Sequence, residues 1–266
     1  MPTTKTSKKR PVAKKPVKQS ARMTLAEAMR ELEKAGSAQT RKTYARHGAA
    51  EPMFGVSFAT LKTMTKRIGV DHELAHALWD TGNFDAQNLA VKIVDPARMT
   101  SEDLDRWVGE MSPSRMCGGY AAMVAAEGPH AAAKAKEWLA SRDARARAAG
   151  WTLLAQLALR DETTPDADFE KRLAEIERTI HTAPNSDREC MNMAVITIGA
   201  RSAGLRKAAL AAAKRIGKVE VDHGDTACKT PDAREYIEKM WAHAKSKGFA
   251  SPAAQERARE RPRLRC

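Results

Sequence analysis

The sequence has few of the aromatic residues that β-sheets favour, which make up 5% of its 266 residues. It is instead rich in Ala, Leu, Met, Glu, Lys and Arg, the residues with the highest helix propensity. No stretch approaches the roughly 18 uncharged apolar residues that a membrane-spanning helix needs. The composition therefore indicates a soluble all-α protein with no membrane partner.

The four cysteines are also too few and too scattered to form a framework. Cys117, Cys190, Cys228 and Cys266 include no Cys-x-x-Cys pair. This spacing excludes a disulfide scaffold and a structural zinc site. We therefore expect a cytoplasmic protein with no metal and no cofactor.

Acidic residues are missing from the first 22 positions, which carry eight Lys/Arg. The formal net charge of +13 includes +3 from residues 251–266, so residues 23–250 carry +2. Residues 1–22 cannot bury enough apolar surface to offset the entropy of ordering, and they contain no apolar signal-peptide core. We expect a disordered basic tail over 1–22, a folded domain over 23–250 and a basic tail over 251–266.

Helical periodicity recurs from one end of the folded domain to the other. Apolar residues follow the i, i+3, i+4, i+7 pattern, as in Leu104, Trp107, Val108 and Met111. Capping-box pairs at Thr24/Glu27 and Ser186/Glu189, and Pro231 after Thr230, indicate helix starts. The predicted helices span 24–35, 37–48, 57–68, 71–81, 84–94, 100–111, 114–127, 129–140, 143–160, 166–181, 187–200, 204–216 and 231–247.

Such a succession of amphipathic helices is typical of an α-solenoid, an α-α superhelix of helical repeats. No strict period is visible, so the repeats would be degenerate and of HEAT-like length. The rival arrangement is a globular helical bundle.

One predicted connection, residues 217–229, is unusually long, and such loops tend to be functional or disordered. It contains the catalytic candidates Asp222, His223, Asp225 and Cys228. The carboxylates of Asp222 and Asp225 are candidates for catalysis, and the alternative is that they shape a turn. The His, Asp and Cys residues match no usual zinc spacing. Cys228 has a basic neighbour in Lys229 that would lower its pKa, although isolated cysteines are more often inert.

Four stretches carry a family resemblance: residues 54–62 (FGVSFATLK), residues 71–79 (DHELAHALW), the Asp95-Pro96 turn and the helix that contains Trp107. They resemble the AlkD-like DNA alkylation repair family, whose HEAT-like solenoids include glycosylases for N3- and N7-alkylated purines. The similarity covers roughly residues 24–215. The resemblance implies recognition or excision of alkylated purines in duplex DNA.

The family's catalytic segment is altered in this chain. Where the glycosylases have Trp-Asp-x-Cys-Asp, residues 114–118 read Ser-Arg-Met-Cys-Gly, so Gly118 replaces the catalytic aspartate. The family's second tryptophan would fall near Val195 or Ile196, and its arginine near Arg147. Glycosylase chemistry stabilises oxocarbenium character with a carboxylate, which Gly118 cannot supply. Whether the chain is an enzyme stays open, and a non-catalytic scaffold for nucleic-acid structures or protein partners is the alternative.

Clustered basic residues on the folded domain predict contacts with double-stranded DNA. The candidates are Lys62, Lys66, Arg115, Arg142, Arg145, Arg147, Lys214, Lys218 and Lys229. The competing interpretation is the solvated polar face that amphipathic helices normally have. Trp79 and Trp138, near predicted helix ends, are candidates for stacking on a base. We expect a monomer, associated with the bacterial nucleoid when bound to DNA.

Overall fold

The computed structural model describes residues 22–110 and 120–259, and these residues form helices and connections with no strand. This confirms the all-α prediction. The α-helices are α1 (Leu25–Ala35), α2 (Ala38–Arg46), α3 (Phe58–Ile68), α4 (His72–Trp79), α5 (Phe84–Ile93), α6 (Ser101–Glu110), α7 (Tyr120–Ala126), α8 (Ala131–Leu139), α9 (Ala144–Arg160), α10 (Asp166–Thr179), α11 (Asn185–Gly199), α12 (Ala203–Ile216), α13 (Ala233–Ser246) and α14 (Pro252–Arg257). A short 3-10 helix, η1, spans Pro96–Arg98.

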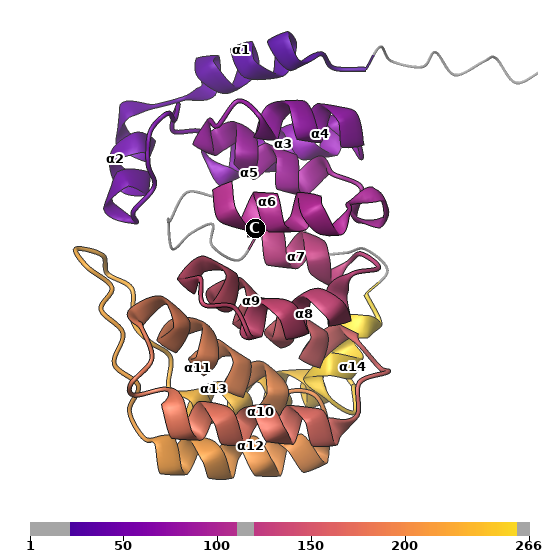
Figure 1. Ribbon diagram of the computed structural model, residues 1–266, viewed down its shortest axis with the longest axis vertical. Coiled ribbons are helices and arrows are strands. Elements are labelled where there is room, and N and C mark those ends of the chain that lie inside the picture. The colour runs from indigo at the N-terminus through magenta and orange to yellow at the C-terminus, as the bar shows by residue number, and fades with distance from the viewer. Residues whose placement is uncertain (1–21, 111–119, 260–266) are drawn as a thin grey trace, which may run out of the picture.

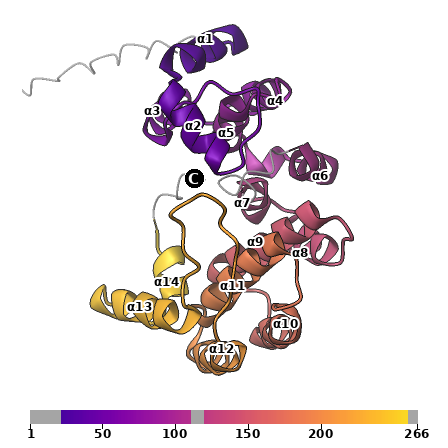
Figure 2. The same cartoon turned by 90° about the vertical axis from the view of Figure 1, so that its left-hand side faces the viewer.

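The helices stack along the long axis of the molecule, from α1 at one end to α12 at the other (Figure 1). Viewed along the helices, the stack curves into a C (Figure 2). Helices α4, α6, α8, α10 and α12 follow its outer side, and α5, α7, α9 and α11 its inner side. Helices α3 and α13 lie at the two ends of the opening. This is the curved solenoid predicted from the sequence, rather than a globular bundle.

A continuous apolar core joins the layers. Helix α9 packs against α7, α8, α11 and α14 and buries about half of its residues, including Trp151 and Leu153. In the N-terminal half of the stack, the rings of Trp79 in α4 and Trp107 in α6 are parallel, with centroids 4.1 Å apart. Within the part of the chain described, no helix has the length and apolarity needed to cross a membrane.

The predicted helix starts are only partly right. The Thr24/Glu27 capping box is present at α1. The Ser186/Glu189 box is wrong, because α11 begins one residue before Ser186, which lies inside its first turn. The Thr230–Pro231 start is also wrong: the carboxylate of Asp232 caps α13 by accepting from the Glu235 amide, and the helix begins at Ala233.

The chain after residue 250 differs from the expected tail. Ser251 caps α14 with its side chain, and Pro252 occupies the first helical turn. Ser251, Pro252 and Ala253 are buried, and the Ala253 amide donates to the Ala200 carbonyl. The prediction of a tail starting at 251 is therefore wrong for residues 251–257, which pack against α9.

Residues 111–119 lie outside the described residues, so the predicted helix 114–127 is described only from Tyr120. Arg115, Cys117 and Gly118 therefore have no structural account.

Candidate nucleic-acid interface

The basic candidates on α3 are fixed at one end of the C-shaped opening (Figure 2). Lys62 and Lys66 are exposed, whereas Leu61, Met64 and Thr65 of the same helix are buried. The Ser57 hydroxyl caps α3 by accepting from the Thr60 amide. Neither lysine forms an ion pair with another described residue, so both ammonium groups are available to an anionic partner.

Asp85 holds the segment that leads into α3. Its buried carboxylate accepts hydrogen bonds from the amides of Phe54, Gly55 and Val56 at 2.6, 2.9 and 2.7 Å. Asp85 belongs to the first turn of α5, where the helix dipole also favours a negative charge. The start of α3 is thereby tied to the inner helix α5.

Helix α2 adds two cations that the sequence analysis did not select. Lys42 and Arg46 are exposed and lie four residues apart, on the side of α2 opposite the buried Tyr44. Their i, i+4 spacing was a usable signal, but it does not distinguish a binding surface from an ordinary solvated face.

The predicted cluster at the start of α9 separates into different roles. Arg147 is held in place because its Nε lies 2.8 Å from the Asp187 carboxylate, which is 4% exposed. Arg147 also donates to the Ser141 and Arg142 carbonyls. Arg145 donates to the Gly109 carbonyl at 2.6 Å. The side chain of Arg142 is exposed and forms no such bond with the described residues. Arg142 is thus the cation of this cluster that is open to a ligand.

The connection between α12 and α13 is an ordered excursion. It passes the beginning of α11 and rises on the inner side of the C to the level of α7 (Figure 2). Asn185 pairs with both backbone groups of Asp222: its Nδ2 donates to the carbonyl at 2.9 Å and its Oδ1 accepts from the amide at 2.8 Å. Arg188 donates to the Glu220 carbonyl, and Val219 is buried.

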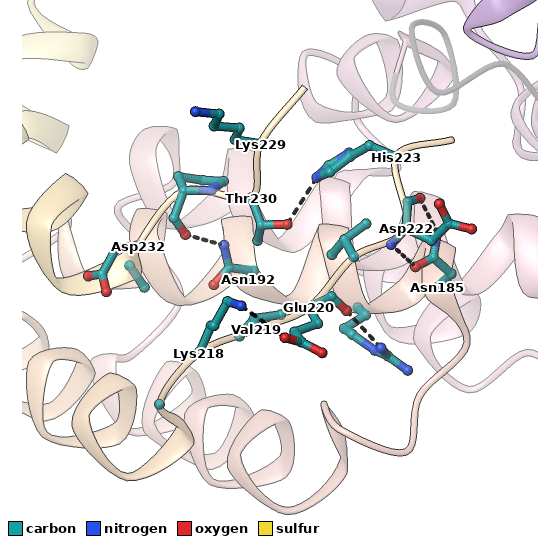
Figure 3. A pocket seen from close by; sticks show the side chains of 15 residues that line it. Asn185, Asn192, Lys218, Val219, Glu220, Asp222, His223, Lys229, Thr230 and Asp232 are labelled. Atoms are coloured by element: carbon teal, nitrogen blue, oxygen red, sulfur yellow. Dashed lines mark hydrogen bonds and ion pairs between the residues drawn. The ribbon is translucent and has the colours of Figure 1, made fainter. Parts of the chain in front are cut away.

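A cavity of about 830 Å³ lies between this connection and α11 (Figure 3). Its cations and carboxylates balance, and they are Arg188, Lys218, Lys229, Glu220, Asp222 and Asp232. Lys218 is already paired with Glu220 at 2.9 Å. The cavity is therefore not a strong anion site, but Lys229 on its rim forms no ion pair with the described residues and points away from the cavity floor (Figure 3).

The catalytic candidates in this connection have different environments. The Asp222 carboxylate accepts from the Gly224 amide at 2.8 Å, where Gly224 has a φ of +56°, so Asp222 shapes a turn. His223 Nε2 lies 3.0 Å from the Thr230 hydroxyl, and its buried Nδ1 has no partner. Asp225 is exposed and forms no side-chain hydrogen bond with described residues.

The two cysteines in the described residues, Cys190 and Cys228, differ in exposure. Cys228 is exposed, and no three His, Cys, Asp or Glu side chains in residues 22–110 and 120–259 converge on a metal-sized site. Burial raises the pKa of the Cys190 thiol to about 11. Cys190 is thus protonated and unreactive at neutral pH.

The remaining candidates are displaced from the opening or buried. Lys214 is exposed on α12, on the outer side of the stack. Trp79 and Trp138 are 1% and 3% exposed, and their indole N–H groups donate to Glu110 and Asp105. The prediction that these two tryptophans stack on bases is wrong because both rings belong to the core.

Comparisons with known proteins agree with this architecture. The family described as "DNA alkylation repair enzyme" matches residues 28–240. The uncharacterized proteins Lmo0209 of Listeria monocytogenes serovar 1/2a and Lin0241 of Listeria innocua serovar 6a are each 31% identical over 215 residues, covering 79% of this chain and 93% of each relative.

A solved structure extends the similarity to three dimensions. It is described as "a new family of proteins related to the HEAT-like repeat DNA glycosylases with affinity for branched DNA structures". It is 30% identical, has a TM-score of 0.77, and the match covers 92% of this chain and 100% of that one. The fold, the family match and these relatives together establish that the chain belongs to the DNA alkylation repair family, with the HEAT-like repeat fold.

Proposed function

We propose that the protein binds branched DNA through the opening of its C-shaped stack. The observation that carries this proposal is the presence of unpaired, exposed cations at both ends of that opening. Lys42, Arg46, Lys62 and Lys66 lie on α2 and α3, and Lys229 lies before α13 at the opposite end. A branched substrate offers phosphates on more than one helical arm, so two separated basic surfaces can each contact one arm.

The relative with affinity for branched DNA supports this choice over a simple duplex binder, since its match extends over nearly the whole chain. This similarity favours a non-catalytic scaffold for nucleic-acid structures over an enzyme that excises alkylated purines from duplex DNA. We expect a monomer that acts in the cytoplasm and associates with the nucleoid when it is bound to DNA.

Fluorescence anisotropy of a chain shortened to residues 23–259 tests the proposal without the terminal charges. We expect a four-way junction to bind at least tenfold more tightly than a duplex of the same base composition. The logarithm of the binding constant should fall with the logarithm of salt with a slope of about −3 or steeper, as for three or more phosphate contacts. Equal affinities, or a slope near zero, would refute branched-DNA binding by the folded domain.

Charge variants then locate the surface. The double substitution Lys62→Ala/Lys66→Ala should make the salt slope shallower by about 2 units. Lys136→Ala is the matched control, because Lys136 is an exposed lysine on the outer helix α8. An equal effect of both variants would point to non-specific charge instead of the opening.

Excision of alkylated purines is the second candidate, favoured by the family match over residues 28–240. The absence of a carboxylate at Gly118 argues against it, and Asp222 is engaged in a turn. We expect no base release from methylated duplex DNA above a no-enzyme control. Release that disappears in Asp225→Asn would instead assign catalysis to the connection between α12 and α13.

A further inference from the structure

Helix α13 exposes the aromatic ring of Tyr236, which does not belong to the buried core. Tyr236 is 43% exposed, and it is one of the large apolar side chains that remain open to solvent in the described part of the chain. The core side of α13 is formed by its neighbours: Ile237 and Ala244 are fully buried, and Trp241 donates to the Gly199 carbonyl at 2.7 Å.

The ring direction follows from the helix register. Glu238 forms an ion pair with Arg206 of α12, so this flank of α13 faces α12. Each residue of a helix turns by about 100°, which places Tyr236 about 160° from Glu238 around the axis. Tyr236 is therefore on the flank of α13 away from α12, and α13 itself lies at one end of the opening (Figure 2).

Tyr236 heads a stripe that contains cations and no carboxylate. The exposed residues Lys239, His243 and Lys247 follow at i+3, i+7 and i+11, all within about 80° of one another around the helix. Neither lysine forms an ion pair with a described residue. Glu238 lies on the opposite flank, Glu235 lies about 40° beyond Lys239 around the helix, and Asp232 caps the helix one turn before Tyr236. An aromatic ring in line with free ammonium groups matches the combination that holds unpaired nucleic acid, with stacking for the base and charge for the phosphates.

We propose that Tyr236 stacks on an exposed base face at the branch point while Lys239 and Lys247 hold the adjoining phosphates, an inference that rests on the proposed binding of branched DNA. In an uninterrupted duplex each base face is covered by its neighbour. At a branch the stack is interrupted, and a planar side chain can cover the last base. The stripe would thus distinguish a branch from a duplex by the exposed base face, independently of sequence.

Full-length protein and a three-way junction with 2-aminopurine at the branch test this inference. The emission of this base analogue falls when it stacks, so wild-type protein should quench it. Tyr236→Ala should remove the quenching and weaken junction binding about tenfold, with no change in duplex affinity. Tyr236→Phe keeps the ring and should behave as wild type. Circular dichroism of each variant establishes that the helices are retained.

Lys239→Ala should weaken junction binding and make its salt slope shallower by about 1 unit. Lys245→Ala is the control, since Lys245 is an exposed lysine of the same helix on the flank toward α12. If wild type binds the junction but Tyr236→Ala retains its affinity and its quenching, the stacking role is wrong while the proposed function stands. If wild type binds neither DNA, the proposed function fails and the inference fails with it.

Discussion

Two buried carboxylates join segments of the chain that are distant in sequence. Asp85 anchors residues 54–56 to α5 through three backbone amides. Asp187, at the beginning of α11, binds Arg147 at the beginning of α9. The second pair explains why a basic residue at the family's arginine position is not simply available to DNA: releasing Arg147 would leave Asp187 buried without its partner.

Asp85→Asn should destabilise the fold strongly. An amide at this position cannot accept from three converging N–H groups as a carboxylate does, and hydrogen bonds to charged groups contribute more than neutral ones. We expect the free energy of unfolding to fall by about 3 kcal/mol, measured by urea denaturation. Glu102→Gln, an exposed position on α6, is the control and should stay within about 0.5 kcal/mol of wild type.

His76 should make stability depend on pH. Burial lowers the pKa of its ring below the usual 6.5, and this outweighs the attraction of the Asp103 carboxylate; His72 and Arg106 lower it further, while Asp80 opposes them. The folded protein therefore binds fewer protons at this ring than the unfolded chain does. This contribution to stability is complete above about pH 6.5 and declines as the pH falls below it.

Urea midpoints measured from pH 7.5 to 5.5 should consequently fall more steeply for wild type than for His76→Gln, whose side chain does not titrate. The other ionisable groups are the same in both proteins, so the difference between the two curves reports His76. Parallel curves would show that this ring does not couple folding to protonation.

At the level of single elements, α14 is a structural part of the domain. Its Glu256 lies 3.8 Å from Arg160 of α9, which also pairs with Glu127 at 3.0 Å. A chain ending at Ala250 keeps the Arg160–Glu127 pair but loses the Arg160–Glu256 pair and the Ala253–Ala200 hydrogen bond. We expect it to lose about 2 kcal/mol of stability, or roughly 4–8 °C in Tm. A chain ending at Arg259 should melt like the full-length protein in the same calorimetric scan.

The sequence predicted the helices well because amphipathic periodicity records which side of each helix is buried. It missed α14 because the arginine-rich composition of residues 251–266 outweighed a local signal, the Ser251 cap followed by Pro252. The path of the 217–229 connection was not predictable either. It depends on Asn185 and Arg188, whose bonds to Asp222 and Glu220 have no sequence pattern.

Tryptophan positions show the same limit. Trp79 and Trp138 lie near helix ends, but the neighbouring helix decides whether a ring is buried, and α6 supplies Glu110 and Asp105 as their hydrogen-bond acceptors. Free cations were easier to predict on α3 than on α9. Lys62 and Lys66 form no ion pair with a described residue, whereas Arg147 meets Asp187 only after folding.

Across the whole molecule, the two arms of the C are joined on the outer side by α6 and α8. Lys134 of α8 is almost completely buried, and its ammonium group lies 2.6 Å from Asp105 of α6 and 2.9 Å from Glu137. Burial acts to lower the pKa of Lys134, but the bonds to these two carboxylates more than compensate and raise it above 10.5. This network holds one arm against the other.

Asp105→Ala should therefore weaken the junction between the arms. It leaves the Lys134 ammonium with one carboxylate and removes the acceptor of the Trp138 N–H group. We expect a loss of about 2 kcal/mol and a broader thermal transition, because a stacked protein unfolds in parts once an internal interface weakens. Asp105→Asn retains an acceptor for Trp138 and should lose less. Identical transitions for both variants and wild type would contradict this role.

The burial of the tryptophans determines which events their fluorescence can report. Trp79, Trp107, Trp138 and Trp151 are each less than 5% exposed, and Trp241 is partly covered. The intrinsic tryptophan fluorescence should then change when the core unfolds but hardly change when DNA binds. Unfolding can thus be followed without a label, whereas an optical signal for DNA must come from the nucleic acid itself.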